Sequence, residues 1–274
     1  MNFKQKLEKI VKKNNSLLCI GLDTDLEKIP KFLLKGSDPI FSFNKSIIDT
    51  TYDLVCCYKP NIAFYEACGI KGLQSLKKTI EYLKTNHSDT PIILDAKRGD
   101  IGNTAEMYAK SAFEYWGADA VTAYPNFGLD SLLPFLRYEQ KLIILLLKTS
   151  NPDSKTFQDI YVNGEPYFMK MGRVIKKWKY NNIGIFVGAT YPDELRSVRN
   201  LFPKSIILTA GIGIQNAKIK NAVLAGIDKN GKNVIYNNSR EIIYASDRDD
   251  FGKVSRKKAK ELRDEINKYR YDCK

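Results

Sequence analysis

The 274-residue sequence has a single histidine and an odd number of cysteines, which leaves few residues for metal or redox chemistry. His87 lies in the polar stretch "TNHSDTP", away from every predicted strand end, so we expect a surface loop residue rather than a general base. The cysteines show neither a metal-ligand spacing nor an even disulfide framework; they are Cys19, Cys56, Cys57, Cys68 and Cys273. Three of them lie in apolar runs, which favours a reducing compartment. We therefore expect a cytoplasmic protein without metal or cofactor.

Long apolar runs are absent as well. No stretch reaches the roughly 18–20 residues that a membrane span needs. The stretch "SLLCIGL" near the N-terminus is too short for a signal or membrane segment, and Asp23 follows it closely. No low-complexity linker or change of composition marks a second domain. The sequence predicts one soluble domain over residues 1–274, with no membrane association.

Positive charge is abundant, with 44 lysines and arginines against 31 acids and a formal net charge of +13. Such a balance is compatible with a basic nucleic-acid-binding protein. The lysines are nevertheless interspersed with acids, as in "KKAKELRDEINKYR" at 257–270, which is typical of a solvated helix face. No aromatic–basic motif such as that of an RRM is present. The charge therefore favours an anionic small ligand over a nucleic acid.

Short apolar runs alternate with amphipathic segments along the chain. Runs that are apolar on both faces are typical of parallel strands covered by helices. The runs lie at 17–22, 54–59, 91–96, 119–123, 142–148, 183–189, 205–210 and 233–237. Helix-like segments lie between them, for example at 68–85, 103–116, 165–180 and 191–201, with a final one at about 252–270.

Eight strands in β–α alternation predict an α/β fold of the (β/α)8 TIM barrel type. A doubly wound sheet is the alternative, but no GxGxxG follows the first run. We expect residues from about 3 to 14 to form a short extra helix at the base of the barrel.

Polar residues follow most of the predicted strands. In a TIM barrel the chemistry takes place at these carboxyl ends, so they should converge at one rim. They are Asp23, Lys59, Asp95 with Lys97, Tyr124, Lys148 with Ser150, Thr190, and Asn238 with Arg240.

The stretch "PIILDAKRGDIGNTA" at 91–105 ends an apolar run with four charged residues. Asp95 and Lys97 should share one strand face, where Lys59 from the neighbouring strand can meet them. Such an array keeps the ammonium groups protonated and directs fixed charges at a ligand. A purely structural ion-pair network is the alternative.

Asp100 comes after the turn at Gly99, on chain that is already leaving the rim. From there it is better placed to project outward than to fold back between Lys59 and Lys97. We expect it to enter the pocket of a second subunit together with Ile101 and Thr104, in a two-fold symmetric homodimer with shared sites.

The stretch "DAKRGDIGNTA" closely resembles the Asp-x-Lys-x-x-Asp signature of orotidine 5′-monophosphate decarboxylases, in particular the subgroup with "DAKRGDIG". Further stretches resemble the family in its order and spacing: "CIGLDTD" at 19–25, "YKPNIAFYE" at 58–66, "YPNFGLDSLLPF" at 124–135, "KTSNPDS" at 148–154, "FVGATYPDEL" at 186–195, "AGIGIQ" at 210–215 and "NNSREIIYA" at 237–245.

The resemblance implies conversion of orotidine 5′-monophosphate to uridine 5′-monophosphate in de novo pyrimidine biosynthesis, without cofactor or metal. It implies a homodimer and allows association with orotate phosphoribosyltransferase. The charged tetrad would be Lys59, Asp95, Lys97 and, from the partner subunit, Asp100. The substrate-binding positions would be Asp23, Asn61, Ile101, Thr104, Ser150, Gly213, Gln215 and Arg240.

Five of these binding positions also have a simpler interpretation from the residues alone. Asp23 could cap a helix, Asn61 or Ser150 could form a turn, and Arg240 could pair with a nearby surface acid. Gly213 could serve only a tight turn, although its loop also offers backbone N–H groups to a phosphate.

Three features leave questions open. Ala210 stands where the family often has proline, and Glu241 stands where a small residue is common, so an acid could face the phosphate. The composition of residues 152–168 predicts a flexible lid.

Related sugar-phosphate enzymes use magnesium and an extra acid near the second strand. Here that strand ends in Lys59-Pro60-Asn61, which favours the nucleotide enzyme.

Overall fold

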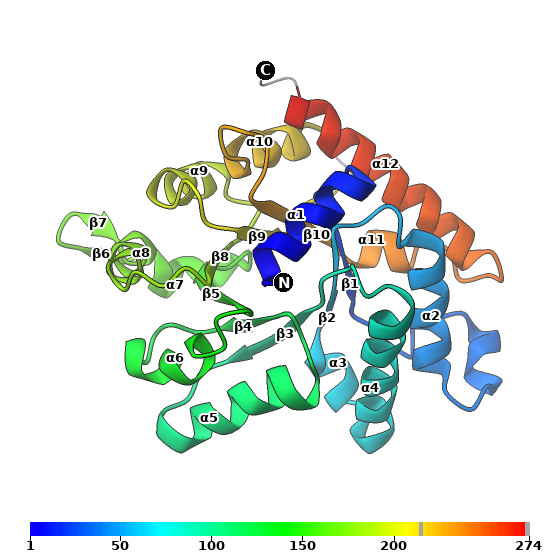
Figure 1. The fold of residues 1–274 in the computed structure, drawn as a ribbon. Helices are drawn as coiled ribbons and strands as arrows, with labels where there is room; N and C mark the ends of the chain where they lie inside the picture. The colour runs from blue at the N-terminus through cyan, green and yellow to red at the C-terminus, as the bar shows by residue number, and fades with distance from the viewer. Residues whose placement is uncertain (214–215, 272–274) are drawn as a thin grey trace.

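The computed structural model describes residues 1–213 and 216–271, and for residues 216–218 only the backbone (Figure 1). Eight parallel strands form one sheet in the order β2-β1-β10-β9-β8-β5-β4-β3. Their bounds are β1 (Leu18–Leu22), β2 (Cys57–Pro60), β3 (Ile93–Arg98), β4 (Ala120–Ala123), β5 (Leu142–Lys148), β8 (Ile183–Val187), β9 (Ile207–Ala210) and β10 (Val234–Asn238).

The two end strands of this sheet meet and close it into a barrel. The backbone N–H of Tyr58 donates to Pro91 O at 3.1 Å, and parallel bridges join Tyr58 to Ile92 and Asn61 to Asp95. Helices surround the strands on the outside in Figure 1. The predicted TIM barrel is confirmed.

Helices follow the strands as the sequence pattern predicts. They are α2 (Pro39–Thr51), α3 (Ile62–Glu66), α4 (Gly69–Asn86), α5 (Gly102–Lys110), α6 (Leu129–Leu136), α8 (Tyr167–Lys177), α9 (Pro192–Leu201), α10 (Asn216–Gly226), α11 (Arg240–Ile243) and α12 (Phe251–Tyr271). A π-helical turn at Ser111–Tyr115 continues α5, and a 3₁₀ helix at Lys31–Lys35 precedes α2.

The strands are buried on both faces because side chains fill the barrel inside and helices cover it outside. All seven residues of β5, "LIILLLK", are buried. The largest offset from the predicted runs is in β2, which begins at Cys57 rather than Leu54. Leu54 still belongs to the turn after α2, where its N–H donates to Thr51 O at 2.9 Å.

The helix α1 (Phe3–Asn14) covers the amino-terminal end of the barrel, as predicted for residues 3–14. Asn2 and Gln5 form a capping box at its start. Lys6 Nζ binds Asp119 Oδ2 at 2.7 Å, just before β4, and Phe3 N donates to Gln140 O at 2.9 Å, just before β5. The last helix ends at the same face, since Tyr271 Oη donates to Asn15 Oδ1 at 2.6 Å.

The segment predicted as a flexible lid, 152–168, contains regular elements. A 3₁₀ turn (Pro152–Ser154) and α7 (Lys155–Gln158) precede a hairpin of β6 (Tyr161–Val162) and β7 (Glu165–Pro166). The hairpin turn is Asn163-Gly164, with φ of 52° and 82°. Asn-Gly is the preferred pair for a two-residue turn with both φ positive, so the sequence carried a hairpin signal here.

Candidate active site

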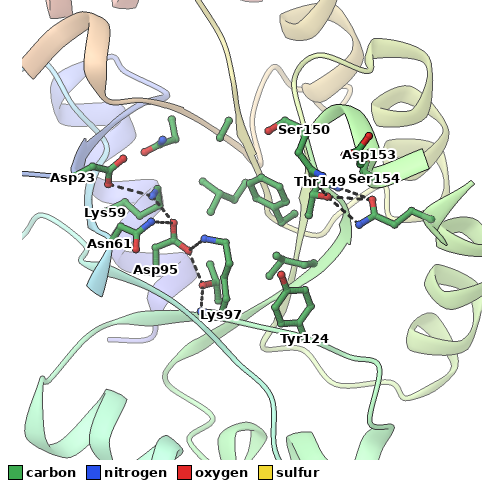
Figure 2. Close-up of a pocket in the computed structure, with 18 of the residues that line it drawn as sticks. Asp23, Lys59, Asn61, Asp95, Lys97, Tyr124, Thr149, Ser150, Asp153 and Ser154 are labelled. Carbon is green, nitrogen blue, oxygen red and sulfur yellow. Dashed lines mark hydrogen bonds and ion pairs between the residues drawn. The ribbon is translucent and has the colours of Figure 1, made fainter. Parts of the chain in front are cut away.

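A cavity of about 670 Å³ opens at the carboxyl ends of the strands (Figure 2). One wall carries Asp23, Lys59, Asn61, Asp95 and Lys97, and the opposite wall carries the polar residues of the loop after β5. A volume of this size suits a small-molecule ligand. The rim predicted from the sequence is therefore where the structure has its pocket.

The Asp95 carboxylate lies at the centre of the charged wall. Its Oδ2 accepts from Lys59 Nζ at 2.7 Å, and its Oδ1 accepts from Lys97 Nζ at 2.8 Å. Lys59 Nζ also lies 4.0 Å from Asp23 Oδ1. The side chains of Lys59 and Asp95 are only 5% and 10% exposed, whereas that of Lys97 is 41% exposed and faces the cavity. Of the two lysines, Lys97 is therefore the one that a ligand in the cavity can reach.

The electrostatics of this array keep its two buried members charged. Burial alone would raise the pKa of the Asp95 carboxyl, but the ammonium groups of Lys59 and Lys97 outweigh burial and hold that pKa well below its usual range. Burial lowers the pKa of Lys59, while the carboxylates of Asp95 and Asp23 raise it, with a net increase. Both groups are therefore ionised at neutral pH.

The backbone of β3 is irregular at Lys97, which simple strand alternation does not predict. The register of β3 against β4 shifts between Leu94 and Arg98, and Lys97 has a φ of 46°. A left-handed backbone costs a non-glycine residue roughly 1–2 kcal/mol. Strained residues of this kind concentrate at functional sites, where surrounding contacts hold them in place.

Thr122 of β4 is a pocket residue that sequence reasoning missed. Its Oγ1 donates to Asp95 Oδ1 at 2.9 Å and accepts from the backbone N–H of Lys97 at 2.9 Å. The available signal was a lone hydroxyl inside the fully buried strand "AVTA".

Two further predicted residues lie beside the array. Asn61 Nδ2 donates to Asp95 Oδ2 at 3.4 Å, and its Oδ1 accepts from Ala63 N at 3.2 Å at the start of α3. Asn61 therefore caps a helix and also lines the pocket. Asp23 lines the pocket, and its buried Oδ1 has no hydrogen-bond partner among the described residues.

The opposite wall consists of Ser150 and the segment after it, with Asp153, Ser154, Phe157 and Gln158. Gln158 ties this segment to the end of β5, because its side chain accepts from Thr149 N at 2.8 Å and donates to Thr149 Oγ1 at 2.9 Å. Sequence reasoning placed Ser150 here but did not single out Gln158.

Lys148 was predicted to be a rim group and does not line the pocket. Its side chain is completely buried, pairs with Asp159 Oδ1 at 2.5 Å and lies 4.8 Å from the centre of the Tyr191 ring. The reason is a register shift between Leu146 and Lys148 in the pairing of β5 with β8, which alters the regular alternation at the end of the strand.

Five of the predicted site residues lie outside the pocket lining, although the structure describes them: Asp100, Ile101, Thr104, Gly213 and Arg240. Asp100 Oδ1 accepts from Ile101 N at 2.8 Å, and Ile101 is 59% exposed. Arg240 is exposed at the first residue of α11. Gln215 lies outside the described residues.

Glu241 lies against the predicted phosphate loop. Asn238 Nδ2 donates both to Glu241 Oε2 at 3.0 Å and to Ile212 O at 2.6 Å, which links α11 to the loop after β9. A Cβ on Gly213 would approach Glu241 Oε1 to 2.9 Å, so a larger residue here would require the Glu241 side chain to shift. Ala210 ends β9, lines the pocket and accepts a hydrogen bond from Ala189 N at 2.8 Å.

The single histidine and the described cysteines lie outside the pocket lining. His87 follows α4 as its C-cap residue and stacks on Tyr52 at a centroid distance of 4.6 Å, away from the pocket lining. Cys19, Cys56 and Cys57 are buried and unpaired, and Cys273 is outside the described residues. Within the described residues, no three His, Cys, Asp or Glu side chains are grouped to hold a metal ion, and no helix is long and apolar enough to span a membrane.

A barrel of this type with a charged pocket at the carboxyl ends of its strands defines a TIM-barrel enzyme. The chain belongs to the orotidine 5′-phosphate decarboxylase / HUMPS family, whose model matches residues 16–252.

Similar proteins match over nearly the whole chain. The orotidine 5′-phosphate decarboxylase of Christiangramia forsetii is 44% identical over 263 residues, which is 96% of each chain. The structure of Leishmania donovani OMP decarboxylase has a TM-score of 0.85 at 36% identity and covers 99% of both chains. The structure of Leishmania donovani UMP synthase has a TM-score of 0.87 at 36% identity, over 98% of this chain and 57% of that one.

Proposed function

We propose that this chain converts orotidine 5′-monophosphate to uridine 5′-monophosphate with the array Lys59–Asp95–Lys97–Asp100 and no cofactor. The activity, that of a carboxy-lyase in pyrimidine biosynthesis, follows from the family and from relatives named as decarboxylases. The observation that carries the residue roles is the pairing of Asp95 with Lys59 and Lys97 at 2.7 and 2.8 Å in the pocket. The test is the loss of orotidine 5′-monophosphate, with equal amounts of uridine 5′-monophosphate and CO₂ formed.

The chemistry explains why fixed charges suit this reaction. When the bond between C6 and the carboxylate breaks, its electron pair stays on C6 as a vinyl carbanion with little delocalisation. A preorganised cation in a site shielded from water stabilises such a charge. The Lys97 ammonium takes this role beside C6 and then donates its proton to that carbon.

Asp95 and Lys59 support Lys97. The Asp95 carboxylate would lie close to the departing carboxylate, so their repulsion is relieved as CO₂ leaves. Lys59 holds Asp95 from the other side. Asp100 completes the array from the partner subunit, together with Ile101 and Thr104. All three lie outside the lining of their own pocket, Asp100 half-buried and Ile101 and Thr104 exposed, which supports this shared site.

The remaining predicted residues bind the nucleotide. Asp23 and Asn61 hold the ribose, and Ser150 reads the pyrimidine from the opposite wall. Gly213, Gln215 and Arg240 bind the phosphate. Binding energy from the phosphate then helps to close the lid, residues 152–168, over the base.

Replacing Arg240 with alanine should raise the KM for the nucleotide by about 100-fold, since a charge-assisted phosphate contact contributes on the order of 1.5–3 kcal/mol. Turnover of orotidine, which has no phosphate, should change little. Steady-state kinetics on both substrates measure this contrast, with Arg196→Ala of α9 as an exposed arginine control. Equal effects on both substrates would show that Arg240 does not contact the phosphate.

Activity should be the same with and without EDTA, and added Mg²⁺ should not increase it. The physical reason is the end of β2, where Lys59 and Asn61 stand in place of an acid and the Lys59 ammonium already binds Asp95 at 2.7 Å. Turnover is measured on protein dialysed against EDTA, with a magnesium-dependent enzyme as the positive control. Loss of turnover on chelation would assign the chain to the metal-dependent sugar-phosphate branch of the family.

We further propose a single-domain cytoplasmic homodimer without nucleic-acid partners that associates with orotate phosphoribosyltransferase. The similarity to a UMP synthase supports that association. This chain covers only 57% of the synthase, so the synthase joins a part similar to this chain to a further part within one polypeptide. Co-purification of the two separately tagged proteins from a mixture tests it.

A further inference from the structure

The hydroxyl of Thr122 connects the two residues at the centre of the pocket. It is 2% exposed and lies between the carboxylate of Asp95 and the backbone of Lys97, at 2.9 Å from each. Because the Asp95 carboxylate is ionised between two ammonium groups, it can only accept a hydrogen bond. The Thr122 proton therefore points to Asp95, and a lone pair of the same oxygen accepts the N–H of Lys97.

This contact falls where the sheet is irregular. The pairing of β3 with β4 shifts register between Leu94 and Arg98, and Lys97 has its φ of 46° within that interval. Here the backbone N–H of Lys97 bonds to a side chain of β4, the Thr122 hydroxyl. A left-handed conformation in a residue with a side chain persists where its neighbours determine it.

The hydrogen bonds form a closed loop. Lys97 N–H donates to Thr122 Oγ1, Thr122 donates to Asp95 Oδ1, and that same oxygen accepts from Lys97 Nζ at 2.8 Å. Lys97 is thus held at both its backbone and its ammonium group.

We propose that Thr122 is a positioning residue for the decarboxylation: its hydroxyl sets the backbone of Lys97 and the orientation of Asp95, and so places the Lys97 ammonium at the reacting carbon. This inference rests on the proposed role of Lys97. Thr122 itself does not contact the reacting atoms.

Thr209 of β9 provides an internal comparison. It is also a completely buried barrel threonine, but its Oγ1 has no hydrogen-bond partner among the described residues. The buried hydroxyl of Thr209 therefore has no hydrogen-bond partner among the described residues, whereas that of Thr122 contacts both Asp95 and Lys97. The same substitution at the two sites separates loss of a hydroxyl from loss of these contacts.

The experiment measures kcat and KM for orotidine 5′-monophosphate in four variants. Thr122→Val keeps the shape and removes the donor and acceptor, and we expect kcat to fall about 100-fold, as small misplacements of reacting groups do. KM should stay within about twofold, because the ribose and phosphate contacts are intact. Thr122→Ser should recover kcat to within a few fold of the wild type. Thr209→Val, the matched control, should leave both constants unchanged, and Lys97→Ala tests the premise.

The outcomes separate this inference from the proposed function. An inactive Lys97→Ala beside a fully active Thr122→Val would overturn the role of Thr122 alone. Equal losses in Thr122→Val and Thr122→Ser would overturn it too, because packing rather than the hydroxyl would then matter. An active Lys97→Ala would overturn the proposed catalytic role and this inference with it. If Thr122→Val fails to show a cooperative thermal transition, the comparison of Thr122→Ser with Thr122→Ala decides in the same way.

Discussion

Replacing Lys97 with alanine is expected to lower kcat by many orders of magnitude while the protein stays folded. Lys97 is the member of the array that reaches the cavity, and it supplies both the cation beside C6 and the proton that replaces CO₂. No other described lysine that lines the pocket is exposed, since Lys59 is buried behind Asp95. A variant that keeps more than about a tenth of the wild-type kcat, a barrier change under ~1.4 kcal/mol, would contradict the assignment.

The fold should tolerate this change because Asp95 keeps other partners. Lys59 still binds Oδ2 at 2.7 Å, and Thr122 still donates to Oδ1 at 2.9 Å. The variant should therefore unfold in one cooperative transition near the wild-type temperature. It should also bind the product, uridine 5′-monophosphate, which shows that the pocket is intact. Lys71→Ala, at an exposed lysine of α4, serves as the control.

Heterodimers of two inactive variants are expected to regain activity. In a dimer of one Lys97→Ala subunit and one Asp100→Ala subunit, one shared site lacks both residues and the other has both. Co-expression with two different tags and tandem purification isolates this heterodimer, which should have about half the wild-type activity per dimer.

The control for this experiment is a dimer that pairs Lys97→Ala with the Lys97→Ala, Asp100→Ala double variant, because it has no intact site. The structural basis is the position of Asp100, outside its own pocket and next to the exposed side chain of Ile101. Two large apolar side chains near this segment are also exposed: Met107 of α5 at 60%, and Phe127, which lies against Gly99, at 58%. Purified heterodimers as inactive as the control would disprove the shared site.

Sequence patterns predicted the barrel because each strand and helix carries its own local signal. An apolar run such as "LIILLLK" identifies a buried strand without knowledge of its neighbours. The meeting of Asp95 with Lys59 could also be predicted, since adjacent parallel strands end at one rim.

The features that were missed depend on contacts between segments far apart in the chain. The left-handed backbone of Lys97 and the contact with Thr122 arise from a register shift between β3 and β4. The burial of Lys148 likewise follows from its pairing across to β8 and from Asp159 in the next loop. Because these strands are apolar on both faces, their sequence pattern does not mark where the register shifts, so these contacts could not be derived from it.

The placement of the chain ends has a practical consequence for immobilising the enzyme. Phe3 begins α1 beside the residues that precede β4 and β5, and Tyr271 ends α12 beside Asn15, so both ends of the described chain lie at the closed face of the barrel. The substrate cavity opens at the other face. A resin, an electrode or a protein scaffold attached at either end would leave the mouth of the pocket unobstructed, and a dual attachment would hold every molecule with its cavity toward the solution.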